Sequence, residues 1–336
     1  MKVLYAIQGT GNGHISRARE IVPILMKYAD VDVLVSGIQA DVKLQFPIKY
    51  KKHGLSFIFG THGGVSYSKT ISSLKPITLL KDIQRFPIHS YDLVINDFEP
   101  LTAWACKLRG KPCLGLSHQA SFLSAKIPRP NKKSWFAEAI LHNYAPVTQK
   151  IGFHFKAYDD FIHTPVIRNE VRQLNPVEKE HFTVYLPAYG DDIMIQELGK
   201  VKDVKWEVFS KHTTFSYKRA NVYIKPINNE SFLKSLESSS GLLTNGGFEG
   251  PAEALFLGKK VMSIPMTNQY EQQCNALALH EVGGVMVNRI DVNFQQSLTN
   301  WVFDTSPVKV DFPDQTEAII QNILFNNMTS KLDLAI

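Results

Sequence analysis

The chain has 336 residues, of which 44% are hydrophobic and 20% are charged, and it carries a formal net charge of +6. This composition excludes a disordered, collagenous or coiled-coil protein, and at about 100–200 residues per domain the length predicts two domains. Three cysteines without metal-ligand spacing, no signal peptide and no apolar run of about 20 residues predict a cytoplasmic protein without a disulfide scaffold or a membrane span.

Short apolar runs alternate with helical patterns in the first half of the chain. The expected strands are residues 3–8, 31–36, 55–59, 92–96 and 113–117. The expected helices are residues 14–28, 74–86, 100–108 and 134–144. Nearly continuous apolar strands that are separated by helices indicate a parallel sheet with helices on both faces.

The same alternation restarts in the second half. The expected strands are residues 182–186, 206–209, 222–224, 241–244 and 260–264. The expected helices are residues 191–199, 230–237, 248–257, 271–281 and 317–324. Residues 163–170 have the composition of a linker, and the net charge is +10 before residue 166 and −4 from there on. We therefore expect two doubly wound, Rossmann-like α/β domains that face a cleft at the carboxyl ends of their sheets.

A glycine-rich turn separates the first strand from the first helix. It consists of Gly9, Thr10, Gly11, Asn12, Gly13 and His14. Glycines let backbone amides approach a ligand, and a helix start favours negative charge. The G-x-G-x-G spacing and the missing acid after the second strand disfavour a nicotinamide enzyme, and the absence of G-K-[ST] excludes a P-loop. His14 is either a general base that the helix start keeps neutral or a residue that caps the turn.

A second glycine-rich turn, in the other half of the chain, gives a stronger signal. Gly246 and Gly247 precede a helix start, an arrangement that holds a diphosphate without a metal. Glu253, further along that helix, either binds two vicinal ribose hydroxyls or compensates the helix dipole. Glu271 and Gln272 open the next helix beside the same cleft, where a carboxylate and an amide suit a sugar.

The block Asn245–Lys260, which reads N-G-G-F-E-G-P-A-E-A-L-F-L-G-K-K, and the later E-Q-Q-C-N-A from Glu271 resemble the donor-binding signature of GT-B glycosyltransferases of families 1 and 28. The turn that ends at His14 resembles the G-x-x-G-H loop of nucleotide-sugar transferases in these families. Residues 164–171 are similar to the G-N-P-V-R linker of the lipid-linked peptidoglycan precursor N-acetylglucosaminyltransferases. The resemblance covers nearly the whole chain.

The resemblance implies a metal-independent hexosyltransferase that needs no cofactor besides its nucleotide-sugar co-substrate. It would move a sugar, with inversion, from a UDP-sugar to a hydroxyl acceptor that is lipid-linked or belongs to the cell envelope. Residues 1–165 would bind the acceptor and residues 166–315 the donor. A C-terminal helix within residues 316–336 would pack back on the first domain.

The resemblance also implies roles for single residues. His14 would deprotonate the acceptor hydroxyl, and Asp97 would orient its ring, unless Asp97 caps the helix that follows. The residues expected to bind the donor are Gly246, Gly247 and Phe248 at the diphosphate, Glu253 at the ribose, Glu271 and Gln272 at the sugar, Ile227 at the nucleobase, and Arg168. The residues expected on the acceptor side are the turn from Gly9 to Gly13 and His118, which is otherwise a hydrogen-bonded loop histidine.

The chain departs from the family pattern at the diphosphate. Asn245, Glu249 and Gly250 replace a phosphate-contacting histidine and an Asn–Ser pair. A carboxylate at position 249 would repel a diphosphate unless it turned away, so Arg168 or Lys225 would have to hold this group. The D-x-D of residues 30–32 precedes a strand and is interpreted as a solvated loop, so no metal site is expected.

Two other functions stay open. Gly13 to Arg17 also resemble the G-H-x-x-R of a nucleotide-sugar hydrolase in which the histidine activates water, and a sugar-nucleotide sensor without catalysis is the third hypothesis. Residues 126–136 are basic and contain Trp135 and Phe136, so they either touch an anionic membrane at the inner face or form a solvated surface. The basic and aromatic character of these residues favours a bulky acceptor. No motif for binding nucleic acid accompanies the charge.

Overall fold

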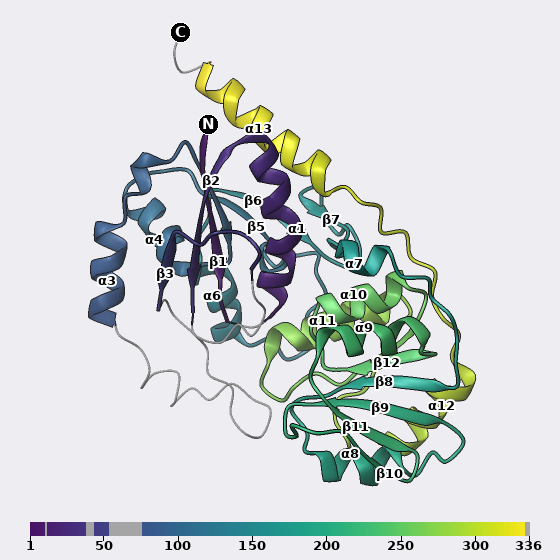
Figure 1. The fold of residues 1–336 in the computed structure, drawn as a ribbon. Helices are drawn as coiled ribbons and strands as arrows, with labels where there is room; N and C mark the ends of the chain where they lie inside the picture. The colour runs from purple at the N-terminus through teal and green to yellow at the C-terminus, as the bar shows by residue number, and fades with distance from the viewer. Residues whose placement is uncertain (11, 38–43, 54–75, 333–336) are drawn as a thin grey trace.

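The computed structural model describes residues 1–10, 12–37, 44–53 and 76–332, which form two lobes, each built on one seven-stranded sheet (Figure 1). The strand orders are β3-β2-β1-β4-β5-β6-β7 and β10-β11-β9-β8-β12-β13-β14. Among the described residues all strand pairs are parallel except β10 with β11. The expected fold of two Rossmann-like sheets is therefore present.

The first lobe contains the first sheet. Its strands are β1 (Lys2–Gln8), β2 (Asp30–Ser36), β3 (Tyr50–Lys52), β4 (Leu93–Asp97), β5 (Leu114–Ser117), β6 (Gln149–Phe153) and β7 (Ile162–His163). Its helices are α1 (Asn12–Tyr28), α3 (Pro76–Arg85), η1 (Ile88–Ser90), α4 (Pro100–Leu108), α5 (His118–Ser121) and α6 (Trp135–Asn143).

Side chains of β1 alternate between two cores, which explains its continuous apolar sequence. Val3 and Tyr5 belong to the core under α1, whereas Leu4 and Ala6 belong to the core that α3 and α4 cover. Successive residues of a strand point to opposite faces, so a central strand with helices on both sides must be apolar throughout.

The second lobe contains the second sheet. Its strands are β8 (His181–Tyr185), β9 (Lys205–Ser210), β10 (Tyr217–Arg219), β11 (Val222–Pro226), β12 (Gly241–Thr244), β13 (Lys260–Ser263) and β14 (Val285–Met286). Its helices are α8 (Asp191–Leu198), α9 (Asn229–Ser238), α10 (Glu249–Phe256), α11 (Tyr270–Glu281) and α12 (Phe294–Asp304). Trp206 and Trp301 are fully buried in its core. The short helix α7 (Asn169–Arg172) lies between the lobes in the sequence.

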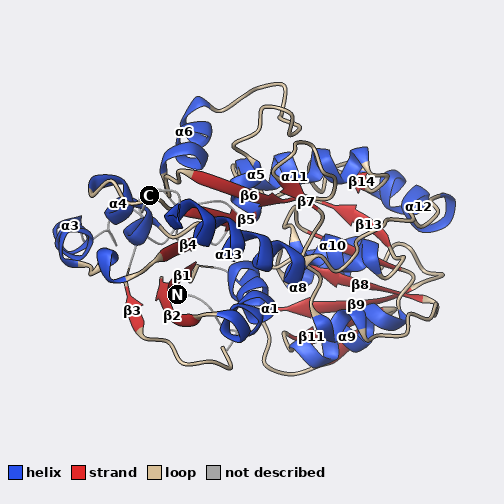
Figure 2. Ribbon diagram, turned by 90° about the horizontal axis from the view of Figure 1, so that it is seen from above, coloured by secondary structure: helices blue, strands red, loops and turns tan. Residues whose placement is uncertain are grey.

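The C-terminal helix α13 (Thr316–Leu332) returns to the first lobe and packs beside α1, as Figures 1 and 2 show. Glu317 accepts a 2.6 Å hydrogen bond from the hydroxyl of Tyr28 at the end of α1. Ile320, Ile323 and Leu324 add apolar contacts to the core of that lobe. The expected return of this helix is therefore present.

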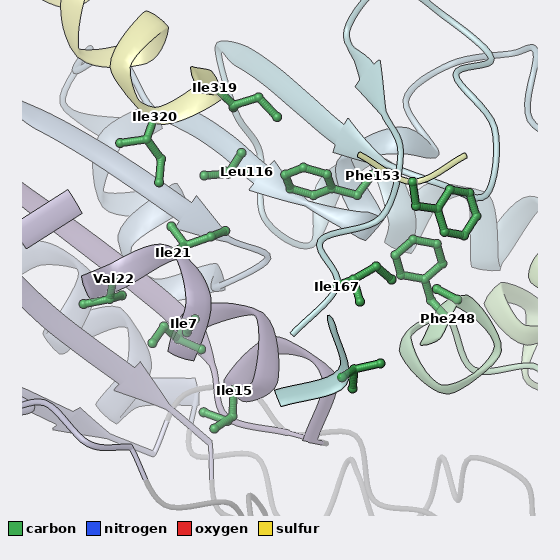
Figure 3. Close-up of a cluster of buried hydrophobic side chains, with 14 of the residues drawn as sticks. Ile7, Ile15, Ile21, Val22, Leu116, Phe153, Ile167, Phe248, Ile319 and Ile320 are labelled. Carbon is green, nitrogen blue, oxygen red and sulfur yellow. The ribbon is translucent and has the colours of Figure 1, made fainter. Parts of the chain in front are cut away.

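One hydrophobic core continues from the first lobe into the second. Phe153 of β6 and Phe248 at the start of α10 belong to the same buried cluster, and Figure 3 shows them close to Ile167 from the connection between the lobes. The carboxyl ends of the two sheets therefore meet in direct side-chain contact.

Several sequence predictions need correction. Residues 30–32 do not precede a strand as a solvated loop, because β2 begins at Asp30, and Asp32 accepts hydrogen bonds from Lys49 and Tyr91 at 2.6 and 2.8 Å. The strands β3, β6, β7, β10 and β14 were not predicted, since they are short and partly exposed. The expected strand 55–59 lies outside the described residues.

Candidate active site

His14 and Asp97 meet where two neighbouring strands of the first sheet end. Ile7 of β1 pairs in register with Asp97, the last residue of β4, and α1 begins four residues after β1 ends. A histidine in the first turn of α1 therefore reaches the end of β4. Its Nδ1 lies 2.7 Å from Oδ1 of Asp97. Asp97 is not the helix cap, because Glu99 caps α4 by accepting hydrogen bonds from Leu101 and Thr102.

The surroundings of Asp97 determine which nitrogen of His14 is free. Asp97 is fully buried, and although burial raises its pKa, the guanidinium of Arg17 and the ring of His14 outweigh this and lower the pKa below its usual value. An ionised carboxylate only accepts hydrogen bonds, so Nδ1 of His14 donates to it. Among the described residues, no hydrogen bond involves Nε2. This nitrogen therefore presents a lone pair that can accept a proton.

Arg17 links this histidine–aspartate pair to the second lobe. It donates from Nε and Nη2 to the two oxygens of Asp97, at 3.0 and 2.7 Å, and from Nη1 to Oε1 of Glu249 in α10, at 2.6 Å. The charge of Glu249 is thus paired with a cation of the other lobe. The sequence motif named Arg17, but its two carboxylate partners were not predicted.

The glycines of the first turn serve packing. Gly9 donates a 2.6 Å hydrogen bond to the carbonyl of Ser36, and a Cβ on Gly9 would lie 3.0 Å from Val35. A Cβ on Gly13 would lie 2.6 Å from Oε2 of Glu249, so only glycine permits this approach. Thr10 accepts a 2.9 Å hydrogen bond from Gln8.

The two remaining residues of this turn are Gly11 and Asn12. Asn12 is exposed at the first position of α1, and Gly11 lies outside the described residues. The described glycines of the turn thus contact protein groups.

The second turn has both packed and open positions. Gly246 lies against the backbone of Gln272 at the start of α11, and its carbonyl accepts a 3.1 Å hydrogen bond from Asn275. Around the Cβ position of Gly247, in contrast, the described residues other than its chain neighbours place no atom within 4 Å. Gly247 is therefore the position at which the backbone of this turn is open to a ligand.

His118 and Phe248 join the lobes. The two rings stack with centroids 3.9 Å apart and planes 4° apart. Nδ1 of His118 contacts the carbonyl of Phe153 at 2.8 Å and Nε2 lies 3.0 Å from Oδ1 of Asn275, while burial lowers the pKa of His118 to about 4. The expectation that His118 touches the acceptor is thus not supported by its position. It is a buried, hydrogen-bonded histidine between the lobes.

Glu253 is 3% exposed and both of its oxygens accept hydrogen bonds from Arg168, at 2.5 and 2.7 Å. Burial raises the pKa of Glu253, and Arg168 opposes that shift. Arg168, expected at the diphosphate, instead holds the acid expected at the ribose. Lys225, the other cation considered for the diphosphate, pairs with Glu207 at 2.8 Å. Ile227, expected at the nucleobase, is 48% exposed just beyond β11.

The residues expected at the transferred sugar open α11. Oε1 of Glu271 accepts a 3.0 Å hydrogen bond from Gln119 of the first lobe, and burial raises the pKa of Glu271. Oε1 of Gln272 accepts a 2.9 Å hydrogen bond from the backbone of Met266. Glu271 therefore faces the first lobe, whereas the amide oxygen of Gln272 holds the loop before its own helix.

The first lobe contains a small hollow close to the end of β4. It is lined by Asn96, Phe98, Gly115, Ser117, Gln119, Ala120, Leu123, Leu141, Ala145 and Val147. Phe98 has the unusual φ of 55°, and its ring stacks parallel to that of His14 with centroids 6.4 Å apart. Oε1 of Gln119 is buried without a hydrogen-bond partner among the described residues. Neither Phe98 nor Gln119 was predicted, since no motif marks them.

Within residues 1–10, 12–37, 44–53 and 76–332, His, Cys, Asp and Glu side chains form no group of three or more suited to a metal ion. In the same part of the chain, none of the helices has both the length and the apolar character that crossing a membrane requires.

Residues 1–302 match the family model described as "Glycosyl transferase family 1". Among solved structures, the chain is similar to Arabidopsis thaliana UGT89C1 complexed with UDP, with 15% identity and a TM-score of 0.59 over 97% of this chain and 94% of that one. It is also similar to Acinetobacter baumannii MurG, with 12% identity and a TM-score of 0.56 over 96% and 99%.

The Streptomyces glycosyltransferase SsfS6, complexed with thymidine diphosphate, matches with 14% identity and a TM-score of 0.54 over 96% of this chain and 99% of that one. A search of curated protein sequences returns no match. The solved structures share the GT-B arrangement of two Rossmann-like domains, and this is the fold that the sequence predicted.

Proposed function

The chain belongs to glycosyl transferase family 1, and from that premise we propose that it transfers a sugar, with inversion, from a UDP-sugar to a hydroxyl group of an acceptor. The observation that carries this proposal is the contact of His14 with Asp97 opposite the glycine-rich start of α10. In this proposal the first lobe binds the acceptor and the second lobe binds the donor.

The proposed reaction is one displacement. Nε2 of His14 takes the proton of the acceptor hydroxyl, and Asp97 stabilises the imidazolium that forms. The acceptor oxygen attacks the anomeric carbon from the side opposite the nucleoside diphosphate, so the configuration inverts when that group leaves. Backbone amides at the start of α10, with Gly247 as the open position, stabilise the charge of the leaving diphosphate, and this makes the transfer metal-independent.

We place the acceptor site beside Phe98, because this residue lines a small hollow and its ring lies parallel to that of His14, with the centroids 6.4 Å apart. Gln119 lines the same hollow, and its amide oxygen has no hydrogen-bond partner among the described residues. We propose a lipid-linked acceptor on the basis of the neighbouring segment 126–136. Trp135 is 81% and Phe136 46% exposed there.

Of the basic residues in segment 126–136, Lys126 and Arg129 pair with carboxylates, whereas Lys132 and Lys133 are exposed and have no ion-pair partner in the described part of the chain. Two lysines and two aromatic rings suit an anionic membrane surface, at about 1 kcal/mol for each lysine. Sedimentation with phosphatidylglycerol vesicles checks this, and we expect the double variant Lys132→Glu and Lys133→Glu to lose binding.

Hydrolysis of a nucleotide sugar is the second candidate. Arg17 is the arginine of the motif that resembles the hydrolase. Its Nη2 lies 3.1 Å from Nδ1 of His14 and donates a hydrogen bond to Asp97. The same base would then activate water in place of an acceptor hydroxyl.

One experiment separates these functions. The purified chain is incubated with a panel of UDP-, TDP- and GDP-sugars, with and without candidate acceptors, while nucleotide binding and nucleotide release are measured. Release that requires an acceptor supports transfer, and release at the same rate without one supports hydrolysis. Binding without release in either condition would indicate a sensor and contradict the proposed transfer.

A further inference from the structure

A buried guanidinium meets a carboxylate where the two lobes touch. Arg17, on the first lobe, is 3% exposed, and Glu249, the first residue of α10, lies on the second lobe. The 2.6 Å hydrogen bond between them spans 232 positions of the sequence. Because Asp97 already occupies Nε and Nη2 of Arg17, Nη1 is the part of the guanidinium that faces the second lobe.

The carboxylate of Glu249 occupies a place that favours an anion. α1 has 17 residues and α10 has 8, and both begin beside it, so the positive ends of two helix dipoles converge there. Gly13 lets the carboxylate approach the start of α1 more closely than any side chain would allow. An internal anion therefore already uses this site.

The two partners differ in their freedom to move. The side chain of Glu249 is 27% exposed, whereas that of Arg17 is 3% exposed and held by two hydrogen bonds to Asp97. Apart from their own chain neighbours, no atom of the described residues lies within 4 Å of the Cβ positions of Gly247 and Gly250, so this part of the chain leaves open space on both sides of Glu249. The carboxylate can swing away while the guanidinium stays in place.

We propose that Arg17 binds the diphosphate of the donor and that Glu249 is an internal substitute, which the diphosphate displaces when the donor binds. This inference rests on the proposed function and adds a diphosphate ligand from the first lobe. A diphosphate carries more charge than one carboxylate, and the planar guanidinium suits phosphate oxygens. The donor thereby contacts the same side chain that orients Asp97 and His14.

Calorimetric titration with UDP, inorganic pyrophosphate and uridine tests the proposal on the full chain. We expect Glu249→Gln to bind UDP and pyrophosphate about tenfold more tightly than the unchanged protein, because the competing carboxylate is gone. Uridine, which has no phosphate, should bind both proteins equally. Glu178→Gln, which changes the net charge equally at an exposed position, serves as the control and should bind like the unchanged protein.

The outcomes separate this inference from the proposed function. If the unchanged protein binds UDP and Glu249→Gln binds it equally or more weakly, Glu249 does not compete with the diphosphate, and only this inference fails. The inference would also be overturned if Glu249→Gln increased the affinity for uridine as much as the affinity for UDP, because the effect would then not depend on the diphosphate. If neither folded protein binds any nucleoside diphosphate, the proposed function fails and this inference with it. Should Glu249→Gln not fold, Glu249→Ser gives the same comparison.

Discussion

Each lobe has a glycine-rich turn between a strand and a helix, and the two turns differ in what their glycines face. In the first turn, Gly9 packs against β2 and Gly13 faces the carboxylate of Glu249. In the second turn, Gly246 packs against α11, but the Cβ position of Gly247 is open. A glycine ahead of a helix therefore indicates close approach, and only the surroundings show whether protein or ligand approaches.

The largest expected effect concerns the first turn. His14→Ala should lower turnover by about 10²–10⁴-fold, because the general base is lost, while nucleotide affinity stays unchanged. The rate of nucleotide release measures the turnover, and calorimetry measures the nucleotide affinity. His89→Ala, which removes an exposed histidine of η1, is the control. Full nucleotide release by His14→Ala would show that the first turn does not carry the base.

His118 makes the contact between the second turn and the first lobe pH-dependent. Its pKa in the folded protein, about 4, lies below the unfolded value, so the unfolded chain binds more protons between these values and stability falls as the pH drops from about 6.5 toward 4. For a shift of this size the loss is roughly 3 kcal/mol, and the buried His154, whose pKa is also lowered, adds to it.

Urea unfolding at several pH values measures this loss of stability. The variant His118→Gln should show a smaller slope with pH than the unchanged protein, and His89→Ala should keep the full slope. An unchanged slope in His118→Gln would mean that His118 does not make the contact between the lobes sensitive to pH.

Two matched substitutions compare the turns directly. Gly13→Ala should destabilise the protein by about 1 kcal/mol, because the new methyl group displaces the carboxylate of Glu249 and breaks its hydrogen bond with Arg17. Gly247→Ala should change the stability by less than about 0.5 kcal/mol, since its surroundings are open, but should weaken UDP binding. Thermal unfolding measures the stability of each variant, and calorimetry measures its UDP binding. If the two substitutions changed the stability equally, the proposed difference between the turns would be wrong.

The smallest expected effect concerns the ribose. If Glu253 binds the ribose hydroxyls, the unchanged protein should bind UDP about tenfold more tightly than 2′,3′-dideoxy-UDP, and Glu253→Gln should reduce this ratio. Glu170→Gln removes another carboxylate that contacts Arg168 and is the matched control. A ratio that Glu253→Gln leaves unchanged would mean that Glu253 only anchors Arg168.

Much of the fold could be predicted because central strands and helices carry strong apolar patterns. Edge strands such as β3 and β14 could not, since two or three partly exposed residues leave no such pattern. The contact of His14 with Asp97 was implied by family resemblance. The partners of Glu249 and Glu253 could not be predicted, because they depend on how the lobes pack, and the sequence separates these pairs by 232 and 85 positions.

The return of α13 to the first lobe has a mechanical consequence. In the described part of the chain, the backbone passes from one lobe to the other ahead of α7 and comes back ahead of α13. Two separate connections resist twisting of one lobe against the other, whereas bending about the line that joins them costs less. Donor entry would therefore require the lobes to separate by bending about this line. A cross-link between α13 and α1, which both belong to the first lobe's side of the molecule, should not prevent that motion.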